Sequence, residues 1–270
     1  MLVSPAALFV SHGAPTLAVE PERAADLREW GRSLEAPEAI VIVSAHWERT
    51  PVSIGTTTPR PLLHDYGGFR GPLQKVTYAA PVAADRADRV ERALAASSLE
   101  SGAVQRVDDR PWDHGVWVPL VHLFPESRVP VLQVSLASRT SPRRLFEIGQ
   151  RLRRELGPDT LVIGSGGIVH NLRAIDWSET DLPPAWASDF EAWARDVLVR
   201  GDRDALMDFA ARAPALHLAH PTLEHWLPML VAAGAGGLGD TGSPGPRFPV
   251  EGFEYGSLGR LGVEFGASVD

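Results

Sequence analysis

Short apolar runs alternate with longer stretches of helical period along the first part of the chain. The runs at Ala6–Val10 and Ala39–Val43 are short and β-branched, which is typical of buried strands. Between them, Pro21–Leu34 carries apolar residues such as Leu27 and Trp30 at helical spacing. A strand, a helix and a second strand in this order predict a β-α-β unit with a right-handed crossover and a parallel strand pair.

The same alternation continues to the end of the chain. Further strands are predicted at Val129–Leu136, Leu161–Gly164, Phe248–Phe253 and Leu258–Phe265. Further helices are predicted at Val82–Ala96, Ser141–Leu156, Trp186–Val199, Arg203–Arg212 and Thr222–Ala233, the last capped by Thr222 and followed by Gly234. The stretch Gly234–Pro246 is rich in Gly and Pro and predicts an irregular surface loop. We therefore expect one α/β domain over residues 1–270, with a mostly parallel central sheet flanked by helices.

Charge and hydropathy exclude several classes of partner. The chain has 26 basic and 34 acidic residues, a net charge of −8, and its arginines cluster only in short pairs such as Arg143-Arg144. Nucleic-acid binding proteins usually carry a concentrated basic face, so no nucleic-acid partner is expected. No apolar run reaches the roughly 20 residues that span a bilayer. The segment Met1–Val10 lacks the basic region of a signal peptide, and a cytoplasmic protein is expected.

Residue usage leaves imidazole and carboxylate as the only strong candidate metal ligands. The 270 residues include nine histidines and no cysteine. The lack of cysteine excludes a disulfide framework, a thiolate metal site and a cysteine nucleophile.

Three histidines fall at equivalent places relative to the predicted strands. His12, His46 and His170 each lie at or just beyond the C-terminal end of a buried strand, beside small residues. In a parallel sheet these ends form one rim, where ligands bind, so the three side chains can converge. A single histidine at such a place more often serves packing, but three together predict a metal site. A fourth candidate comes from the segment His220–His225, at the start of a predicted helix.

The other histidines carry weaker signals. His64 lies in a turn-like loop, and His114 follows Asp113, which could instead cap a helix. The remaining three are interpreted as structural. His122 is expected in the packed core, His217 in a solvated loop, and His220 near the predicted helix that follows it.

Six short motifs occur along the chain in a fixed order. They are Ser11-His12-Gly13-Ala14-Pro15, Ser44-Ala45-His46-Trp47, His64-Asp65-Tyr66-Gly67-Gly68-Phe69, Asp113-His114-Gly115-Val116-Trp117, Ile168-Val169-His170-Asn171-Leu172 and Pro221-Thr222-Leu223-Glu224-His225. In this order they resemble the DOPA 4,5-dioxygenase type of class III extradiol ring-cleaving dioxygenases, the superfamily of the protocatechuate 4,5-dioxygenase catalytic subunit. The resemblance runs from about Leu8 to about Phe265 and implies a single catalytic domain of that type. One departure is Gly167, where the family often has asparagine.

The resemblance implies a role for six of the histidines. Metal ligands would be His12, His46 and His225, while His170 would be a fourth ligand or the catalytic acid/base. His114 would be a second acid/base or a hydrogen-bond donor at the edge of the substrate, and His64 would line the substrate pocket.

The implied cofactor is one divalent metal ion per chain, Fe(II) for ring cleavage or Zn(II). The implied reactants are O₂ and a small catechol, DOPA or a related one, which would chelate the metal while histidines move its protons. An iron triad usually contains a carboxylate, and Glu224 or Glu48 could supply it. Two alternatives remain open, namely a zinc-dependent hydrolase with the same ligands and a non-catalytic metal-binding member of the superfamily.

Overall fold

One eight-stranded sheet forms the centre of the computed structural model, which describes residues 4–68, 71–95, 104–176 and 182–266. The strands follow one another in space as β4 (Gln105–Arg106), β3 (Ser53–Ile54), β5 (Val131–Leu136), β2 (Ala39–Glu48), β6 (Thr160–Gly166), β1 (Ala7–Ser11), β10 (Gly262–Phe265) and β7 (Arg247–Val250). The central strands β5, β2, β6 and β1 are parallel, while β10 at one side pairs antiparallel with both β1 and the edge strand β7. A separate hairpin pairs β8 (Phe253–Glu254) with β9 (Leu258–Gly259). The predicted α/β class and mostly parallel sheet are confirmed.

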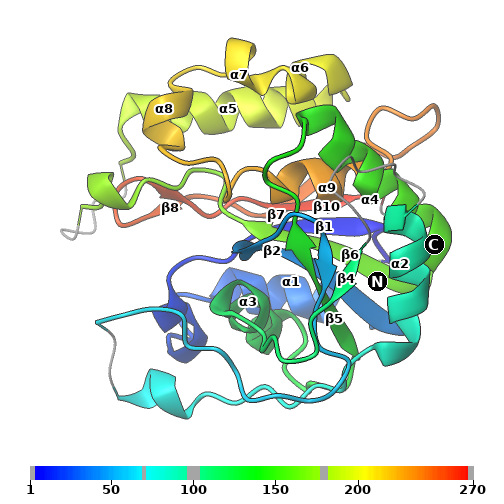
Figure 1. The fold of residues 1–270 in the computed structure, drawn as a ribbon. Helices are drawn as coiled ribbons and strands as arrows, with labels where there is room; N and C mark the ends of the chain where they lie inside the picture. The colour runs from blue at the N-terminus through cyan, green and yellow to red at the C-terminus, as the bar shows by residue number, and fades with distance from the viewer. Residues whose placement is uncertain (1–3, 69–70, 96–103, 177–181, 267–270) are drawn as a thin grey trace.

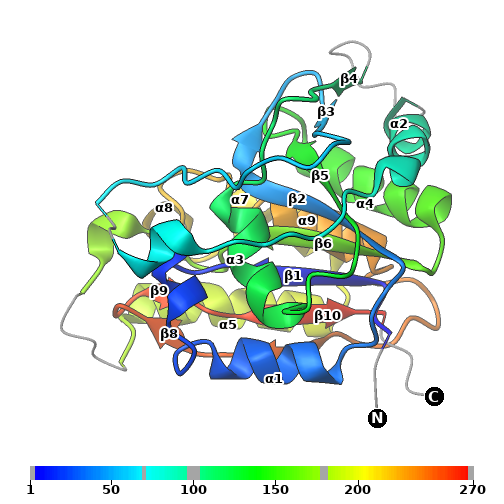
Figure 2. The ribbon, with the colours of Figure 1, turned by 90° about the horizontal axis from the view of Figure 1, so that it is seen from below.

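Helices cover both faces of the sheet (Figure 1). One face carries α1 (Ala25–Ser33) and α3 (His114–Leu123), which lie in front of the strands in Figure 2. The other face carries α2 (Ala87–Ala95), α4 (Pro142–Leu156) and α9 (Pro228–Ala235), and beyond them α5 (Ala185–Val199), α6 (Arg203–Met207), α7 (Phe209–Arg212) and α8 (Leu216–Ala219). Short 3-10 helices are η1 (Pro15–Val19), η2 (Pro72–Lys75), η3 (Ala84–Arg86) and η4 (Leu172–Ala174). Within the described ranges, no helix combines the length and the apolar character needed to cross a membrane.

The strands are apolar throughout because both of their faces are buried. In β2, Ile40 and Ile42 pack toward α1 and α3, while Val41 and Val43 pack toward α4 and α9. Side chains of a strand alternate between its faces, so a continuous apolar run supplies both hydrophobic layers.

Strand order differs from the predicted β-α-β pair. The strands β1 and β2 are both parallel, but neither pairs with the other, because β6 lies between them and pairs with both. The C-terminal ends of β1 and β2 therefore face each other across the end of β6.

The helix predicted over Thr222–Ala233 begins later, at Pro228. The carbonyl of His225 accepts a hydrogen bond from the amide of Gly167 at 3.0 Å rather than from a residue of its own segment. The hydroxyl of Thr222 donates to Glu224 and caps no helix. Because its backbone is bonded to the segment after β6, the stretch that carries His225 is a turn.

Several other predicted boundaries were wrong for local reasons. The helix predicted over Arg203–Arg212 is two helices, because the backbone of Asp208 is not helical. The two C-terminal strands are each divided, the first into β7 and β8 at Gly252, which has positive φ, and the second into β9 and β10 at Arg260, whose amide donates to the Gly252 carbonyl. The helix predicted over Val82–Ala96 begins at Ala87 after η3, and its last predicted residue, Ala96, lies outside the described residues.

Two glycines of β6 allow the turn before α9 to lie directly on the strand. A Cβ on Gly164 would come within 2.2 Å of the Pro228 carbonyl oxygen, and one on Gly166 within 2.1 Å of the His225 carbonyl oxygen. Both distances are far below van der Waals contact, so only glycine permits this approach. Close contact with β6 is what places His225 beside the strand ends.

We predict that Gly164→Ala lowers the free energy of unfolding by about 1–3 kcal/mol, because the added methyl group must push the backbone at Pro228 away from the sheet. Urea denaturation followed by circular dichroism measures the change. Gly245→Ala is the matched control, since a Cβ there meets nothing within 4 Å. Equal unfolding midpoints for the two variants would contradict the close approach.

Candidate metal centre

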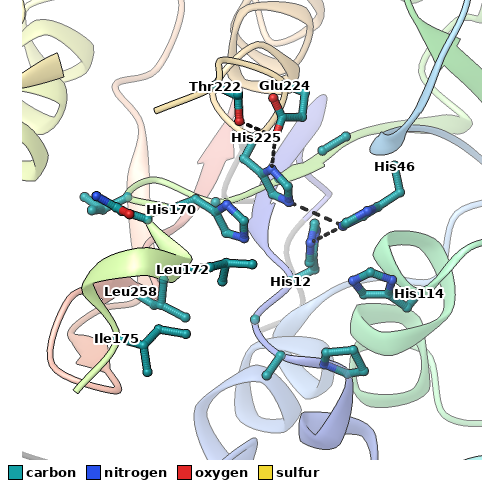
Figure 3. A pocket seen from close by; sticks show the side chains of 18 of the residues that line it. His12, His46, His114, His170, Leu172, Ile175, Thr222, Glu224, His225 and Leu258 are labelled. Carbon is teal, nitrogen blue, oxygen red and sulfur yellow. Dashed lines mark hydrogen bonds and ion pairs between the residues drawn. The ribbon is translucent and has the colours of Figure 1, made fainter. Parts of the chain in front are cut away.

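Three histidines from separate segments converge at the C-terminal edge of the sheet (Figure 3). His12 follows β1, His46 lies near the end of β2, and His225 lies in the turn before α9. The Nε2 atom of His46 is 3.1 Å from Nε2 of His12 and 3.3 Å from Nε2 of His225. One ligand atom from each ring lies within 4.8 Å of the others. Three imidazole nitrogens therefore point at one position.

The opposite nitrogen of each ring faces an oxygen atom. His12 Nδ1 lies 3.0 Å from the Ser165 hydroxyl, which donates its own hydrogen to the Gly115 carbonyl and so can accept one. His225 Nδ1 lies 3.1 Å from a Glu224 carboxylate oxygen, and His46 Nδ1 lies 3.7 Å from a carboxylate oxygen of Asp65. These oxygens favour a proton on Nδ1 and a lone pair on Nε2. Metal-bound histidines in proteins are oriented in this way, so the three residues fit a divalent metal ion.

Burial keeps these rings neutral. The pKa values of His12 and His225 lie well below the usual range, because the rings are buried and because neighbouring histidines would repel a second positive charge. Burial and His114 lower the pKa of His46 to about 4, against an opposing effect of nearby carboxylates. Neutral imidazole is the form that binds metal, so no proton has to be removed at pH 7.

His170 lies beside the three converging nitrogens rather than among them. Its ring stacks on that of His225, with centroids 3.5 Å apart and planes 8° from parallel. No described residue forms a hydrogen bond with its ring nitrogens, and a Cβ on Gly167 would lie in contact with the His170 side chain, 3.6 Å from Cδ2. Burial and then the neighbouring His220 lower the pKa of His170 to about 4.

His114 is the first residue of α3, and the centroid of its ring lies 3.9 Å from the ring centroid of His46. Its Nδ1 is 2.7 Å from a carboxylate oxygen of Asp65. The preceding Asp113 stands at the N-cap position, but its side chain does not cap the helix. Instead it accepts hydrogen bonds from Ser44 at 2.7 Å and from Arg110 at 3.0 Å, which tie the start of α3 to β2.

His64 does not line the cavity, contrary to the prediction. It is exposed and packs edge-on against Tyr66 and Trp117, because the hydrogen bond from Trp117 Nε1 to the Leu63 carbonyl holds this loop against α3. The next two residues, Asp65 and Tyr66, line the cavity instead. Phe69, the end of this motif, lies outside the described residues.

The three remaining histidines serve packing or face solvent, as predicted. Buried His122 and His220 each place Nε2 2.9 Å from a backbone carbonyl, of Leu17 and Ile168 respectively. His217 is exposed, but it belongs to α8 and not to a loop.

A cavity of about 910 Å³ opens beside the histidines. Leu172, Ile175 and Leu258 form an apolar wall below His170 (Figure 3). Of the two carboxylates considered from the sequence, Glu48 lines the cavity without contacting a histidine, and Glu224 lies behind His225. Neither belongs to the converging group, in which all three ligand atoms are histidine nitrogens.

Two residues that support the histidines were not predicted as functional, namely Asp65 and Ser165. Asp65 follows His64 in one of the six motifs, which was the only sequence signal for it. Ser165 lies inside β6 with its hydroxyl facing the His12 ring, and a serine in a buried strand carries no such signal by itself.

Comparisons with known proteins agree with this geometry. The protein-family model described as "Catalytic LigB subunit of aromatic ring-opening dioxygenase" matches residues 6–266. A protein of Beta vulgaris named 4,5-DOPA dioxygenase extradiol is 33% identical over 233 residues, covering 85% of this chain and 86% of that protein. A protein of the same name from Escherichia coli K12 is 32% identical over 268 residues, covering 96% and 94%. The crystal structure of an uncharacterized protein from Escherichia coli K12 superposes with a TM-score of 0.76 at 28% identity, covering 96% of this chain and 99% of that one.

We predict that His225→Ala abolishes tight binding of one Zn(II) per chain while the far-ultraviolet circular dichroism stays unchanged. His225 contributes one of the three converging nitrogens, and its side chain can be removed without touching the strands. Elemental analysis after desalting gives the stoichiometry. His217→Ala, which removes an exposed histidine outside the site, should keep the metal. A His225→Ala variant with full metal content would show that the ligands lie elsewhere.

We predict that the metal-free protein is most stable above pH 6.5 and loses stability as the pH falls toward 4. The pKa values of His46, His170 and His220 are about 4 in the folded state against 6.5 when unfolded, so the unfolded chain binds more protons in this window. Each pKa unit corresponds to a free energy on the order of 1 kcal/mol. Burial raises the pKa values of Glu191 (to about 7) and Glu254, which opposes the trend but involves fewer groups. Urea denaturation at pH 7.5, 6.0 and 5.0 measures the slope, and equal stability at all three would contradict the burial of neutral histidines.

Proposed function

The chain belongs to the family of the catalytic LigB subunit of aromatic ring-opening dioxygenases, and from this premise we propose that it is an extradiol dioxygenase that opens the ring of a catechol with O₂. The observation that carries the proposal is the convergence of three imidazole Nε2 atoms beside two further histidines in one cavity. A catechol has two adjacent hydroxyl groups that must lose protons before they can chelate a metal. The site combines candidate ligands with candidate proton acceptors.

The residues proposed to hold the metal are His12, His46 and His225. When bound there, a divalent ion would supply Lewis acidity to the two catechol oxygens and, as Fe(II), the ability to react with O₂. Three protein ligands leave other coordination positions free for substrate. An all-histidine set also suits Zn(II), and we propose Fe(II) as the ion that supports ring opening.

His114 and His170 are proposed as the acid/base residues. The Nε2 atom of His114 has no hydrogen-bond partner among the described residues, while Nδ1 faces the carboxylate of Asp65. This arrangement suits a base that takes a proton from a substrate hydroxyl at Nε2. His170, with a pKa of about 4, is neutral at pH 7 and can accept a proton and return it later to the opened ring.

The substrate is proposed to be DOPA or a related catechol. A cavity of about 910 Å³ has room for substituents beyond a single ring, and Leu172, Ile175 and Leu258 offer an apolar surface against which the ring or a side chain could pack. Relatives that bear the name 4,5-DOPA dioxygenase extradiol support the choice of DOPA as the first compound to test.

Anaerobic reconstitution with Fe(II), followed by a catechol panel that includes L-DOPA and then O₂, tests the function. We predict a yellow ring-opened product with uptake of one O₂ per product, and no such product from protein loaded with Zn(II). Absence of product and of O₂ uptake with every catechol would refute the proposal. Anaerobic ester or amide hydrolysis by the Zn(II) form would then identify a hydrolase.

A further inference from the structure

Asp65 reaches two histidines of the site with one carboxylate. It belongs to the loop between β3 and η2, far in sequence from both partners. Its Oδ1 atom accepts a hydrogen bond from the backbone amide of His114 at 3.1 Å and lies 2.7 Å from His114 Nδ1. Its Oδ2 atom lies 3.7 Å from His46 Nδ1. The Asp65 side chain thus faces the Nδ1 atoms of both a proposed metal ligand, His46, and a proposed acid/base residue, His114.

The contact with Asp65 determines which nitrogen of His114 carries the proton. An ionised carboxylate can only accept hydrogen bonds, so at 2.7 Å the Nδ1 atom must be the donor. The lone pair is then on Nε2, which faces the cavity. The carboxyl group of an aspartate is ionised at neutral pH, and the hydrogen bonds from the amide and Nδ1 of His114 stabilise the ionised form.

The same carboxylate favours the corresponding tautomer of His46. Nε2 of His46 points toward the nitrogens of His12 and His225, which leaves Nδ1 to carry the proton. Asp65 Oδ2 is the acceptor nearest that proton among the described contacts. The rings of His46 and His114 lie 3.9 Å apart, so displacement of Asp65 would disturb both at once.

A second interpretation is that Asp65, His46 and His114 bind a cation themselves, since their ligand atoms lie within 4.8 Å of one another. The distances favour a hydrogen-bonding role. A nitrogen that donates a hydrogen bond to Oδ1 has no lone pair for a metal, and 2.7 Å is an ordinary length for such a bond.

We infer that Asp65 is a positioning residue. Its hydrogen bond fixes His114 as the Nδ1-protonated tautomer, so that Nε2 of His114 takes the substrate proton, and its charge favours the same tautomer of His46, whose Nε2 faces the proposed metal position. The inference rests on the proposed function for the role of that proton. The tautomers themselves follow from the contacts of Asp65 and can be tested separately.

Nitrogen NMR of the imidazole rings in ¹⁵N-labelled Zn(II)-loaded protein tests the tautomers without any turnover. Signals of His114 are assigned by their loss in His114→Gln. We expect wild-type His114 as the Nδ1–H tautomer and a mixture of tautomers in Asp65→Asn, whose amide can donate as well as accept. A wild-type His114 protonated on Nε2 would overturn the inference whether or not Asp65→Asn folds.

Steady-state kinetics at saturating Fe(II) separates positioning from ligation. We expect Asp65→Asn to lower kcat about 10–100-fold with KM changed less than threefold and one metal ion still bound. Glu191→Gln, which replaces a buried carboxyl group with no described contact to these histidines, should keep wild-type kcat.

Two kinetic outcomes would overturn the inference. Loss of the metal from Asp65→Asn at saturating concentration would make Asp65 a ligand, and unchanged kcat would leave it without a role in the reaction. Failure of the proposed function is distinguishable, because then the wild-type protein itself forms no ring-opened product while the NMR result still stands.

Discussion

The structure depends on holding three neutral imidazoles with their lone pairs directed at one point. When all three Nε2 atoms carry lone pairs, nitrogens 3.1–3.3 Å apart repel each other, so in these tautomers the contact itself does not favour the arrangement without a cation. Oxygen atoms of Ser165, Asp65 and Glu224 face the Nδ1 atoms and orient the three rings. Burial of the rings makes protonation of the imidazoles unfavourable. Polar groups that face one another in a dry environment are stable when something binds between them, and the three histidines fit a divalent metal ion in that place.

The fold provides the rigidity that this arrangement requires. His12 follows β1 and His46 lies near the end of β2. These two parallel strands flank β6, and both of their faces are packed under helices. Because β6 contributes glycines where the backbone of the His225 turn crosses it, the third proposed ligand is fixed by backbone contact with the sheet. The three histidines are therefore positioned together by the ends of β1 and β2, by the contact of the His225 turn with β6, and by the carboxylate of Asp65.

The class of fold and the convergence of His12 and His46 could be predicted from the sequence, because apolar runs identify buried strands and the ends of parallel strands share one rim. The order of the strands could not, since every central strand is equally apolar and β6 lies between the two strands predicted to pair. The turn at His225 was predicted as a helix because its residues suit one. A hydrogen bond from the amide of Gly167, which is distant in the chain, determines the backbone conformation of this turn. Asp65 and Ser165 act through contacts between segments far apart in sequence, which local patterns do not record.

Anomalous diffraction at the iron edge, from crystals grown anaerobically with Fe(II) and a catechol, tests most directly whether the three Nε2 atoms form the metal centre. The account predicts one anomalous peak about 2.0–2.2 Å from Nε2 of His12, His46 and His225, with both catechol oxygens bound to the same ion. A peak between Asp65, His114 and Nδ1 of His46, or no peak among these histidines, would contradict it.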